Sequence, residues 1–199
     1  MKGNPTDSAG AAPRPRRTVD PLRAQWRREL RAAREALADR PGREARLLAR
    51  VEHWLQSADV ARLAFFWPTR GEPDLAALVS RWLQADCSRI AGLPVIEGEL
   101  LRFAPWSPGV PLVSGPFDIQ IPDTERRIDP QLLLIPCVGI DAMRYRLGYG
   151  GGYYDRTLAA LSPRPLTVGV GFDCARIETI DPKPHDLRLD VAMTESGSW

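Results

Sequence analysis

The sequence predicts a single α/β domain with three layers, α/β/α, around a mainly parallel central sheet. The chain has 199 residues, of which 44% are hydrophobic, and this is enough for one substantial core. Segments with apolar residues at helical spacing alternate along the chain with short, continuous apolar runs. Such alternation is typical of parallel strands joined by helices that cover both faces of the sheet.

The composition excludes several classes of protein. A formal net charge of only +2 argues against overall disorder, and the longest apolar runs are far shorter than the roughly 20 residues that span a bilayer. The three cysteines, Cys87, Cys137 and Cys174, are an odd number without metal-site spacing, which argues against a disulfide framework and a zinc site. Residues 1–15 lack the apolar core of a secretory signal, so we expect a cytoplasmic protein.

Positive charge is concentrated at the N-terminus. Residues 1–50 carry 13 Lys and Arg against 6 Asp and Glu. Residues 1–18 lack periodicity and are predicted to be a disordered basic tail, which leaves 19–199 as the domain. The charge fits either a nucleic-acid-binding surface or the solvated face of an amphipathic helix. Because nearly all of it is arginine, whose planar donors suit phosphates and carboxylates, some of these residues could also be ligands.

Two helices are predicted at the start of the domain. Asp20 is a capping residue and Pro21 fits a first turn, and apolar residues at helical spacing continue this helix to about residue 39. The helix carries Leu22, Trp26, Leu30, Ala33 and Leu37 on its apolar face. A break at Pro41 separates it from a second helix at 42–55.

The remaining elements follow from apolar runs and helical spacing. We expect strands at 60–67, 89–95, 100–104, 131–135 and 166–172, and helices at 74–83 and 153–161. The first strand, helix and strand of this set form a β-α-β unit. The segment 105–130 contains prolines at 105, 108, 111, 116, 122 and 130, so we expect a loop that covers the surface.

The segment from Arg146 to Arg156 carries most of the chemical information. Four of the five residues 148–152 are glycine, directly before a predicted helix. Glycines let backbone N–H groups converge, and a helix N-terminus adds partial positive charge, so the segment predicts a phosphate site flanked by two arginines. It lacks the Lys-Ser/Thr of a Walker loop, and Tyr153 stands where a dinucleotide fingerprint has its third glycine. A merely flexible turn is the alternative.

Strand residues 132–136, the turn at 139–141 and the glycine–tyrosine segment closely resemble the signature of the 5-formyltetrahydrofolate cyclo-ligase (5,10-methenyltetrahydrofolate synthetase) family. The resemblance extends from about residue 20 to 194. It implies an α/β/α fold and an ATP- and Mg²⁺-dependent conversion of 5-formyltetrahydrofolate to 5,10-methenyltetrahydrofolate. In this reaction the formyl oxygen is phosphorylated, the ring closes, and ADP and phosphate are released.

The resemblance also implies roles for individual residues. It assigns catalysis to Arg146, Tyr153 and Asp155, and Mg²⁺ binding to the carboxylates of Asp155 and Asp190. It places Glu72 near the pterin, with Tyr153, Phe103 and Trp106 packed on the folate rings. The implied ATP-binding residues are Arg23, Arg27, Arg146, Leu147, Gly148, Tyr149, Gly150, Gly151, Gly152, Tyr153, Tyr154 and Arg156.

Three positions depart from the family pattern. Arg23 replaces a usual Lys, Arg144 replaces a usual Gly in the turn after Asp141, and Cys137 replaces the Gly that commonly follows the strand proline. None lies in the glycine loop, so we expect ATP binding to be retained. The register of the first helix could shift by one residue, which would give Arg28 in place of Arg27.

Some residues and functions keep two interpretations. Asp141 could bind metal or cap its loop, His185 could handle protons or cap a turn, and Asp190 could be a solvent-facing strand residue. A paralogue acting on another formyl or acyl compound would need the same ATP site. A non-catalytic nucleic-acid-binding protein is disfavoured because the chain has no recognised nucleic-acid motif. We therefore expect small-molecule substrates, no nucleic-acid or membrane partner, and a monomer.

Overall fold

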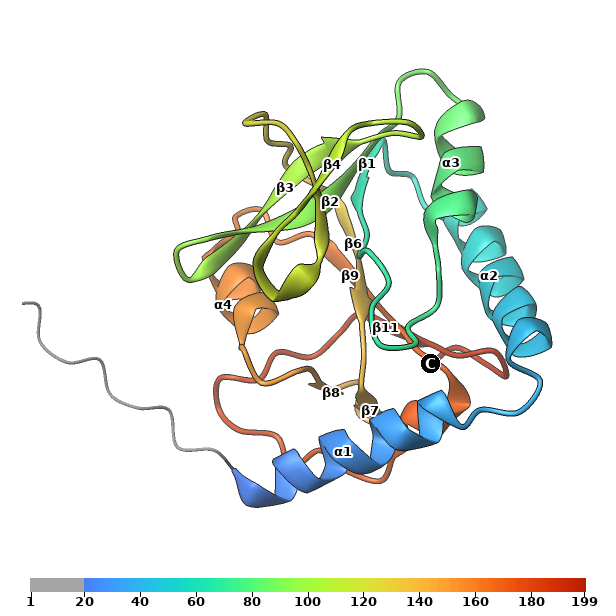
Figure 1. Cartoon of the computed structure of the whole chain (residues 1–199), viewed down its shortest axis with the longest axis vertical. Coiled ribbons are helices and arrows are strands. Elements are labelled where there is room, and N and C mark those ends of the chain that lie inside the picture. The colour runs from blue at the N-terminus through green and yellow to red at the C-terminus, as the bar shows by residue number, and fades with distance from the viewer. Residues whose placement is uncertain (1–19) are drawn as a thin grey trace, which may run out of the picture.

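The computed structural model describes residues 20–199, so the prediction of a disordered tail at 1–18 lies outside the described residues. Its centre is a six-stranded sheet in the order β11 (Val191–Met193), β9 (Leu166–Val170), β6 (Leu132–Pro136), β1 (Arg62–Ala64), β2 (Ile90–Glu97) and β3 (Leu100–Trp106) (Figure 1). Five of these strands are parallel, and β3 alone pairs antiparallel, with β2. The prediction of a mainly parallel sheet is confirmed.

Helices cover both faces of this sheet. Helices α2 (Arg40–Ser57) and α3 (Ala76–Gln84) pack on one face, and α4 (Tyr153–Ala160) packs on the other (Figure 1). Successive residues of β6 show the division, because Leu132 and Leu134 join the core beneath α2 and α3, whereas Leu133 and Ile135 join the core beneath α4. This alternation is the two-residue period of a strand buried on both faces. The three-layer prediction is therefore confirmed.

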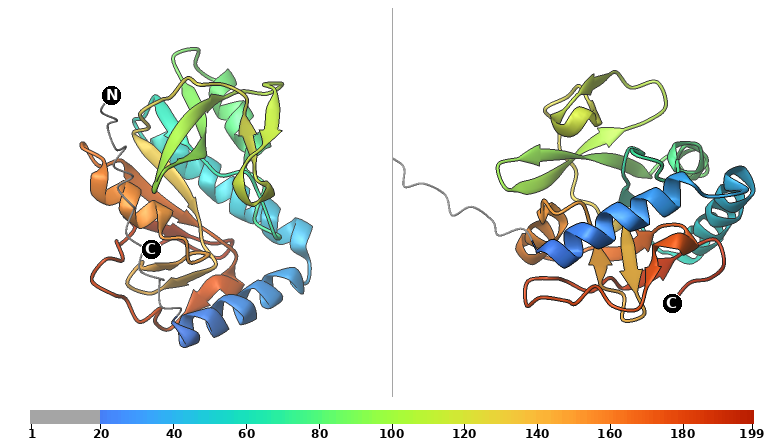
Figure 2. Two further views of the ribbon diagram at one scale, coloured as in Figure 1. Left: turned by 60° about the vertical axis from the view of Figure 1, so that its left-hand side comes forward. Right: turned by 60° about the horizontal axis from the view of Figure 1, so that its bottom comes forward.

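Helix α1 (Pro21–Glu35) lies across one end of the sheet (Figures 1 and 2). The Asp20 carboxylate caps it by accepting hydrogen bonds from the backbone N–H groups of Leu22 and Arg23. The helix ends before the predicted residue 39. Pro41 does not lie between the two helices as predicted. It lies in the first turn of α2, where a backbone N–H has no hydrogen-bond partner within the helix, so its absence in proline costs nothing.

Short strands that the sequence analysis missed surround the main sheet. The segment 105–130, expected to be loop, contains an antiparallel pair, β4 (Leu112–Ser114) and β5 (Gln120–Pro122), joined through the 3-10 turn η1 (Pro116–Asp118). A second small sheet contains β10 (Arg176–Ile177), β7 (Gly139–Asp141) and β8 (Arg146–Leu147), and η2 (Asp173–Ala175) precedes β10. None of the helices described between residues 20 and 199 is long and apolar enough to cross a membrane.

The order of the strands creates a crevice. The chain passes from β1 outward to β2 and β3, then returns to β6 beside β1 and continues in the other direction to β9 and β11. The connections that leave β1 and β6 therefore diverge. In parallel sheets such a switch point opens a crevice at the carboxyl ends of the strands, where ligands usually bind.

Candidate active site

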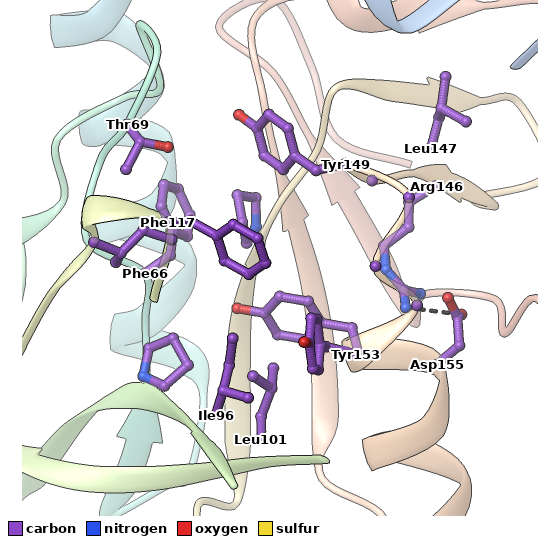
Figure 3. A pocket seen from close by; sticks show the side chains of 18 of the residues that line it. Phe66, Thr69, Ile96, Leu101, Phe117, Arg146, Leu147, Tyr149, Tyr153 and Asp155 are labelled. Carbon is purple, nitrogen blue, oxygen red and sulfur yellow. Dashed lines mark hydrogen bonds and ion pairs between the residues drawn. The ribbon is translucent and has the colours of Figure 1, made fainter. Parts of the chain in front are cut away.

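A cavity of about 510 Å³ lies at this switch point. Residues 66–72, which follow β1, form one wall, and residues 146–155, which run from β8 into the first turn of α4, form the opposite wall. Figure 3 shows side chains from both walls turned toward one another, with the Phe117 ring reaching between them from the β4–β5 connection. Arg23 and Arg27 of α1, residues 185–186, and mostly apolar residues of β2, β3, the end of β6 and the β4–β5 hairpin complete the lining. The cavity is thus assembled from segments far apart in the sequence.

The glycine loop, residues 148–152, contributes backbone to the cavity. Gly150 (φ +96°) and Gly152 (φ +67°) adopt left-handed conformations, and Gly152 is the residue at the start of α4. A Cβ at Gly151 would come 2.7 Å from the Tyr153 ring. The Arg27 guanidinium donates a 2.7 Å hydrogen bond to the Gly148 carbonyl. A loop of this form at a helix N-terminus can bind an anion.

Arg146 and Asp155 form an ion pair beside this loop. Arg146 Nη2 lies 2.8 Å from Asp155 Oδ1, and Nη1 donates to the Leu187 carbonyl at 3.0 Å. Figure 3 marks the ion pair with a dashed line. The Leu187 N–H donates to the same Asp155 oxygen. Both of these hydrogen bonds to Asp155 end on Oδ1, so Oδ2 has lone pairs that can meet a ligand.

A metal ion at this site would depend on the bound substrate for most of its ligands. Within residues 20–199, no group of three or more His, Cys, Asp or Glu side chains is arranged to hold a metal. Mg²⁺ usually takes one or two protein carboxylates and completes its coordination with water and substrate phosphates. Asp155, at the cavity wall beside the glycine loop, fits that pattern.

On the opposite wall, the Glu72 carboxylate is buried and held from both sides. Its Oε1 accepts a 2.5 Å hydrogen bond from the Tyr149 hydroxyl, and its Oε2 accepts from the backbone N–H and the hydroxyl of Thr69 at 3.0 and 3.3 Å. Burial raises the pKa of Glu72, and these hydrogen bonds together with the charge of Arg34 offset only part of the rise. Burial and the nearby Glu72 charge raise the pKa of Tyr149 to about 12, so its hydroxyl stays protonated.

Arg23, predicted to bind ATP, uses most of its donors within the protein. It lines the cavity, but its Nε donates to the Ile180 carbonyl and its Nη2 donates to the Asp181 carbonyl and to Asp186. The guanidinium is therefore used to attach α1 to the loop before β11. Arg27 lines the cavity and Arg28 does not, which favours the unshifted register of α1.

Two residues predicted to pack on folate rings lie in the core instead. Phe103 is only 3% exposed and packs in the core beneath α4, and Trp106 packs edge-on against Phe65 with ring centroids 4.9 Å apart. Neither lines the cavity. The geometry does not support the predicted folate contact, because these residues occupy buried positions of β3, whose length and antiparallel pairing the sequence did not reveal.

Two polar residues of the predicted site also lie outside the cavity lining. The Asp190 carboxylate accepts hydrogen bonds from the backbone N–H and the hydroxyl of Thr167 at 2.8 and 2.7 Å, which ties the start of β11 to β9. It does not join Asp155 at the cavity, contrary to the predicted metal pair. Arg156 donates to the carbonyls of Glu99 and Gly151, so it supports the glycine loop from outside.

The other open positions are explained by local hydrogen bonds. Asp141 is buried and its carboxylate accepts from the backbone N–H groups of Tyr145 and Ile180, which agrees with the loop-capping interpretation. Arg144 has a φ of +67°, the conformation for which glycine is preferred, and its Nε donates to the Leu189 carbonyl. Cys137 is buried in the core, where burial raises the pKa of its thiol to about 12. His185 is largely exposed at the cavity rim.

The sequence analysis missed several residues of the cavity wall, among them Phe66, Trp67, Arg70, Ile96 and Phe117. Phe117 is 67% exposed, which is unusual for an aromatic residue. An aromatic residue within a proline-rich, polar segment is the sequence signal that could have identified it as part of the site. Arg34, which contacts Tyr149, lies eleven residues after Arg23 and seven after Arg27. This spacing repeats the same helix face, so the pattern was visible in the sequence.

Much of the basic charge of α1 and the start of α2 is used inside the molecule. Arg34 and Arg40 donate to groups around Glu72, and Arg43 pairs with the buried Glu195 at 2.7 Å. Together with Arg23 and Arg27, these residues are five of the seven arginines between positions 20 and 43, and each has a partner within the protein. They therefore serve as structural ties, a role that the sequence analysis did not include.

Comparisons with known proteins agree with this geometry. The model of the 5-formyltetrahydrofolate cyclo-ligase family matches residues 19–195. The Escherichia coli K12 protein named 5-formyltetrahydrofolate cyclo-ligase is 31% identical over 147 residues, which cover 69% of this chain and 79% of that protein. The protein of the same name from Mycolicibacterium smegmatis is 25% identical over 154 residues, which cover 71% and 78%.

Two solved structures have the same fold. The NMR structure of Aquifex aeolicus 5,10-methenyltetrahydrofolate synthetase has a TM-score of 0.75 and 27% sequence identity, and the match covers 89% of this chain and 91% of that one. The 5,10-methenyltetrahydrofolate synthetase from Mycoplasma pneumoniae has a TM-score of 0.71 at 20% identity, covering 87% and 98%, and supports the fold alone. The family model, the relatives and the cavity confirm the resemblance seen in the sequence: this chain belongs to the 5-formyltetrahydrofolate cyclo-ligase family.

Proposed function

We propose that this protein converts 5-formyltetrahydrofolate to 5,10-methenyltetrahydrofolate with the consumption of ATP, releasing ADP and phosphate. The observation that carries the proposal is that one cavity joins two kinds of site. One wall offers a glycine loop with Arg146 and Asp155, and the other offers a buried carboxylate with aromatic and apolar side chains. A phosphorylated nucleotide fits the first wall and a pterin ring fits the second.

The first wall has the groups that phosphoryl transfer needs. Such reactions depend on positioning and on neutralising the charge of the phosphates, which backbone N–H groups, arginines and a metal can supply. The glycine loop and Arg146 would hold the terminal phosphates, with Arg27 supporting the loop at the Gly148 carbonyl. Asp155 would hold Mg²⁺ together with the phosphates, and the bound ion would neutralise phosphate charge.

The second wall has the groups that would orient the folate. Glu72 is only 5% exposed, so a ring N–H donor that reaches its carboxylate makes a charge-assisted hydrogen bond away from bulk water. Phe117 and Tyr153 lie on the path between the walls and would pack on the rings (Figure 3). The substrate's formyl group would then face the nucleotide.

The proposed chemistry has two steps. The formyl oxygen attacks the γ-phosphorus of ATP, the bond from that phosphorus to the β,γ-bridging oxygen breaks, and ADP leaves. The neighbouring folate nitrogen then attacks the activated formyl carbon, loses its proton, and phosphate departs as the methenyl bridge forms. The residues of the cavity bind and orient both substrates and exclude water from the activated intermediate.

We also propose a monomer in the cytoplasm as the working form. The glycine loop, Asp155 and Glu72 of a single chain meet in one cavity, which is what a monomeric enzyme requires. Cys87, Cys137 and Cys174 are unpaired, as expected in a reducing compartment.

The direct test is to incubate the purified protein with 5-formyltetrahydrofolate, ATP and Mg²⁺ and to follow the ultraviolet absorbance of the methenyl product. We expect a signal that requires both ATP and the folate. No product with either the monoglutamate or a polyglutamate form of the substrate would contradict the proposal. ADP release with a different formyl compound, and none with the folate, would favour the paralogue.

A further inference from the structure

The Tyr149 hydroxyl connects the two walls of the cavity. Its backbone belongs to the glycine loop, but its side chain crosses to the segment that follows β1. There the hydroxyl lies 2.5 Å from Glu72 Oε1 and 2.8 Å from Arg34 Nη2. One phenol oxygen therefore joins α1, the glycine loop and the carboxylate of the opposite wall.

The chemistry of these three groups sets the direction of the hydrogen bonds. A guanidinium can only donate, so Tyr149 accepts from Arg34 and turns its own proton toward Glu72. Arg34 is itself fixed, because its Nε donates to the Arg70 carbonyl at 3.1 Å and its side chain is buried. The Arg70 guanidinium in turn stacks on the Tyr149 ring at 5.3 Å. The phenol is thus held from its edge and from its face.

This arrangement leaves Glu72 with a defined orientation. Thr69 donates to Oε2 and Tyr149 donates to Oε1. These hydrogen bonds prevent free rotation of the carboxylate, so the acceptor position that remains for a ligand has a fixed direction. Arg40 donates to the Glu72 backbone carbonyl at 3.1 Å, which holds the main chain as well. A carboxylate held in this way can accept one further hydrogen bond, from an N–H donor on a flat ring, through the remaining lone pair of Oε1.

We propose that Tyr149 is a positioning residue for Glu72: its hydroxyl keeps the carboxylate oriented for the folate, although its backbone lies in the loop assigned to ATP. This inference rests on the proposed function. It departs from the assignment of Tyr149 to ATP binding, because it predicts that loss of the hydroxyl affects the folate and not the nucleotide.

The surroundings of Glu72 make the effect of the hydroxyl measurable. The charged and titratable groups nearest to it come from several elements: Arg34, Arg40, Arg70, Cys137, Arg146, Tyr149 and Tyr154. Burial raises the pKa of Glu72, and the hydrogen bond from Tyr149 is the largest opposing influence. Removing that donor should raise the pKa of Glu72 further, so that less of the carboxylate is ionised at a given pH.

The test is the variant Tyr149→Phe, which removes one oxygen and keeps the ring beside Arg70. We expect the KM for 5-formyltetrahydrofolate to rise about 10-fold, as for a hydrogen bond to a charged group, with kcat and the KM for ATP changed less than about 2-fold. The acid limb of kcat/KM for the folate should move to higher pH. The control is Tyr145→Phe, which removes a phenol oxygen from a tyrosine that does not line the cavity and should leave all these parameters unchanged.

A double-mutant cycle separates positioning from a general structural effect. If Tyr149 acts through Glu72, adding Tyr149→Phe to Glu72→Gln should weaken folate binding, measured by calorimetry, no more than Glu72→Gln does alone. Full additivity of the two changes would overturn the inference. So would an equal rise of the KM for ATP and for the folate, since that would place Tyr149 in the nucleotide site.

A measurement without substrate keeps this inference separate from the proposed function. The Glu72 carboxyl can be followed by ¹³C NMR in protein labelled at glutamate, with its signal assigned by its loss in Glu72→Gln. Its titration midpoint should lie higher in Tyr149→Phe than in the parent chain, and an unchanged midpoint would contradict the positioning role. An inactive parent protein with a shifted midpoint would count against the folate reaction alone.

Discussion

Arg23 and Asp186 form a buried ion pair between the first helix and the loop before the last strand. Arg23 Nη2 lies 2.5 Å from Asp186 Oδ2, and the two side chains are only 9% and 8% exposed. The Lys183 backbone N–H donates to the same carboxylate oxygen. The pair therefore fixes the loop that contains Leu187, whose backbone carbonyl and N–H bond to Arg146 and Asp155. Through this loop the pair supports the site without contacting a phosphate.

The variant Asp186→Asn should destabilise the protein by about 3 kcal/mol, because it removes the nearest counter-charge of the buried Arg23 guanidinium and leaves only the more distant Asp20, 4.0 Å from its Nε, and the charge of Asp181. Burial alone would raise the pKa of Asp186, but the hydrogen bonds from Arg23 and Lys183 outweigh it and lower the pKa. The pair thus contributes its stability above the carboxyl's unfolded pKa of about 4, and this contribution is lost as the pH falls further.

Urea unfolding between pH 3 and 8 measures this contribution. The difference in unfolding free energy between the parent and Asp186→Asn should be constant from about pH 5 to 8 and should shrink below about pH 4. A difference that grows toward acid would contradict the ion pair. The exposed pair Arg81–Glu52 offers a control, because Glu52→Gln should cost less than about 1 kcal/mol.

Arg146→Ala should lower kcat/KM for ATP about 100-fold, the size of effect seen when one preorganised donor is lost from an active site. Arg146→Lys should recover only part of this, since an ammonium cannot reproduce the two directions in which the guanidinium meets Asp155 and the Leu187 carbonyl. Steady-state kinetics at saturating folate measure both. If either substitution raised the KM for the folate as much as the KM for ATP, the division of the cavity into two walls would be contradicted.

Gly150→Ala should abolish most of the activity while the protein remains folded. Gly150 has a φ of +96°, and a Cβ there would come 3.4 Å from the Arg27 guanidinium carbon. Gly109 is the matched control, because it has a φ of +84° and a Cβ added to it would meet nothing within 4 Å. Both substitutions should cost about 1 kcal/mol of stability in thermal melts, and only Gly150→Ala should change turnover. Similar loss of activity in Gly109→Ala would indicate strain in general.

Phe117→Ala should raise the KM for 5-formyltetrahydrofolate several-fold, by roughly the 1 kcal/mol that a ring contact contributes, and leave the KM for ATP unchanged. Because the ring is 67% exposed, its loss should not lower the melting temperature. Val113→Ala on the same hairpin is a control, since Val113 is also exposed but does not line the cavity. A fall in melting temperature for Phe117→Ala would mean that the ring packs on the protein.

The sequence was a good guide to the elements of the central sheet and to its helices. Long periodic segments such as 21–35 and apolar runs such as 132–136 carry their signal within themselves. Strands of two or three residues, such as β8 and β11, do not, because their pairing partners lie far along the chain. The β4–β5 hairpin was missed for a similar reason, since its prolines indicated loop while its pairing outside the main sheet left no periodic pattern.

The site was predictable where chemistry is local and not where it depends on packing. The glycine loop, Arg146 and Asp155 are contiguous in sequence and were identified together. Phe103 and Trp106 were misplaced because their side-chain direction depends on the register of β3 against β2. Whether a polar side chain faces a ligand or the protein also depends on its hydrogen-bond partners. Asp190, for example, accepts hydrogen bonds from Thr167 and so faces the protein. No local pattern contains that information.

The placement of β1 beside β6 has a kinetic consequence. The hydrogen bond between Glu72 and Tyr149 spans 77 positions of the chain, so neither half of the molecule can assemble the cavity alone. Closing a loop of that length is entropically unfavourable and slows the formation of non-local contacts. During refolding from denaturant, helical circular dichroism should therefore recover before enzyme turnover, and turnover should return only with the step that docks these two neighbouring strands.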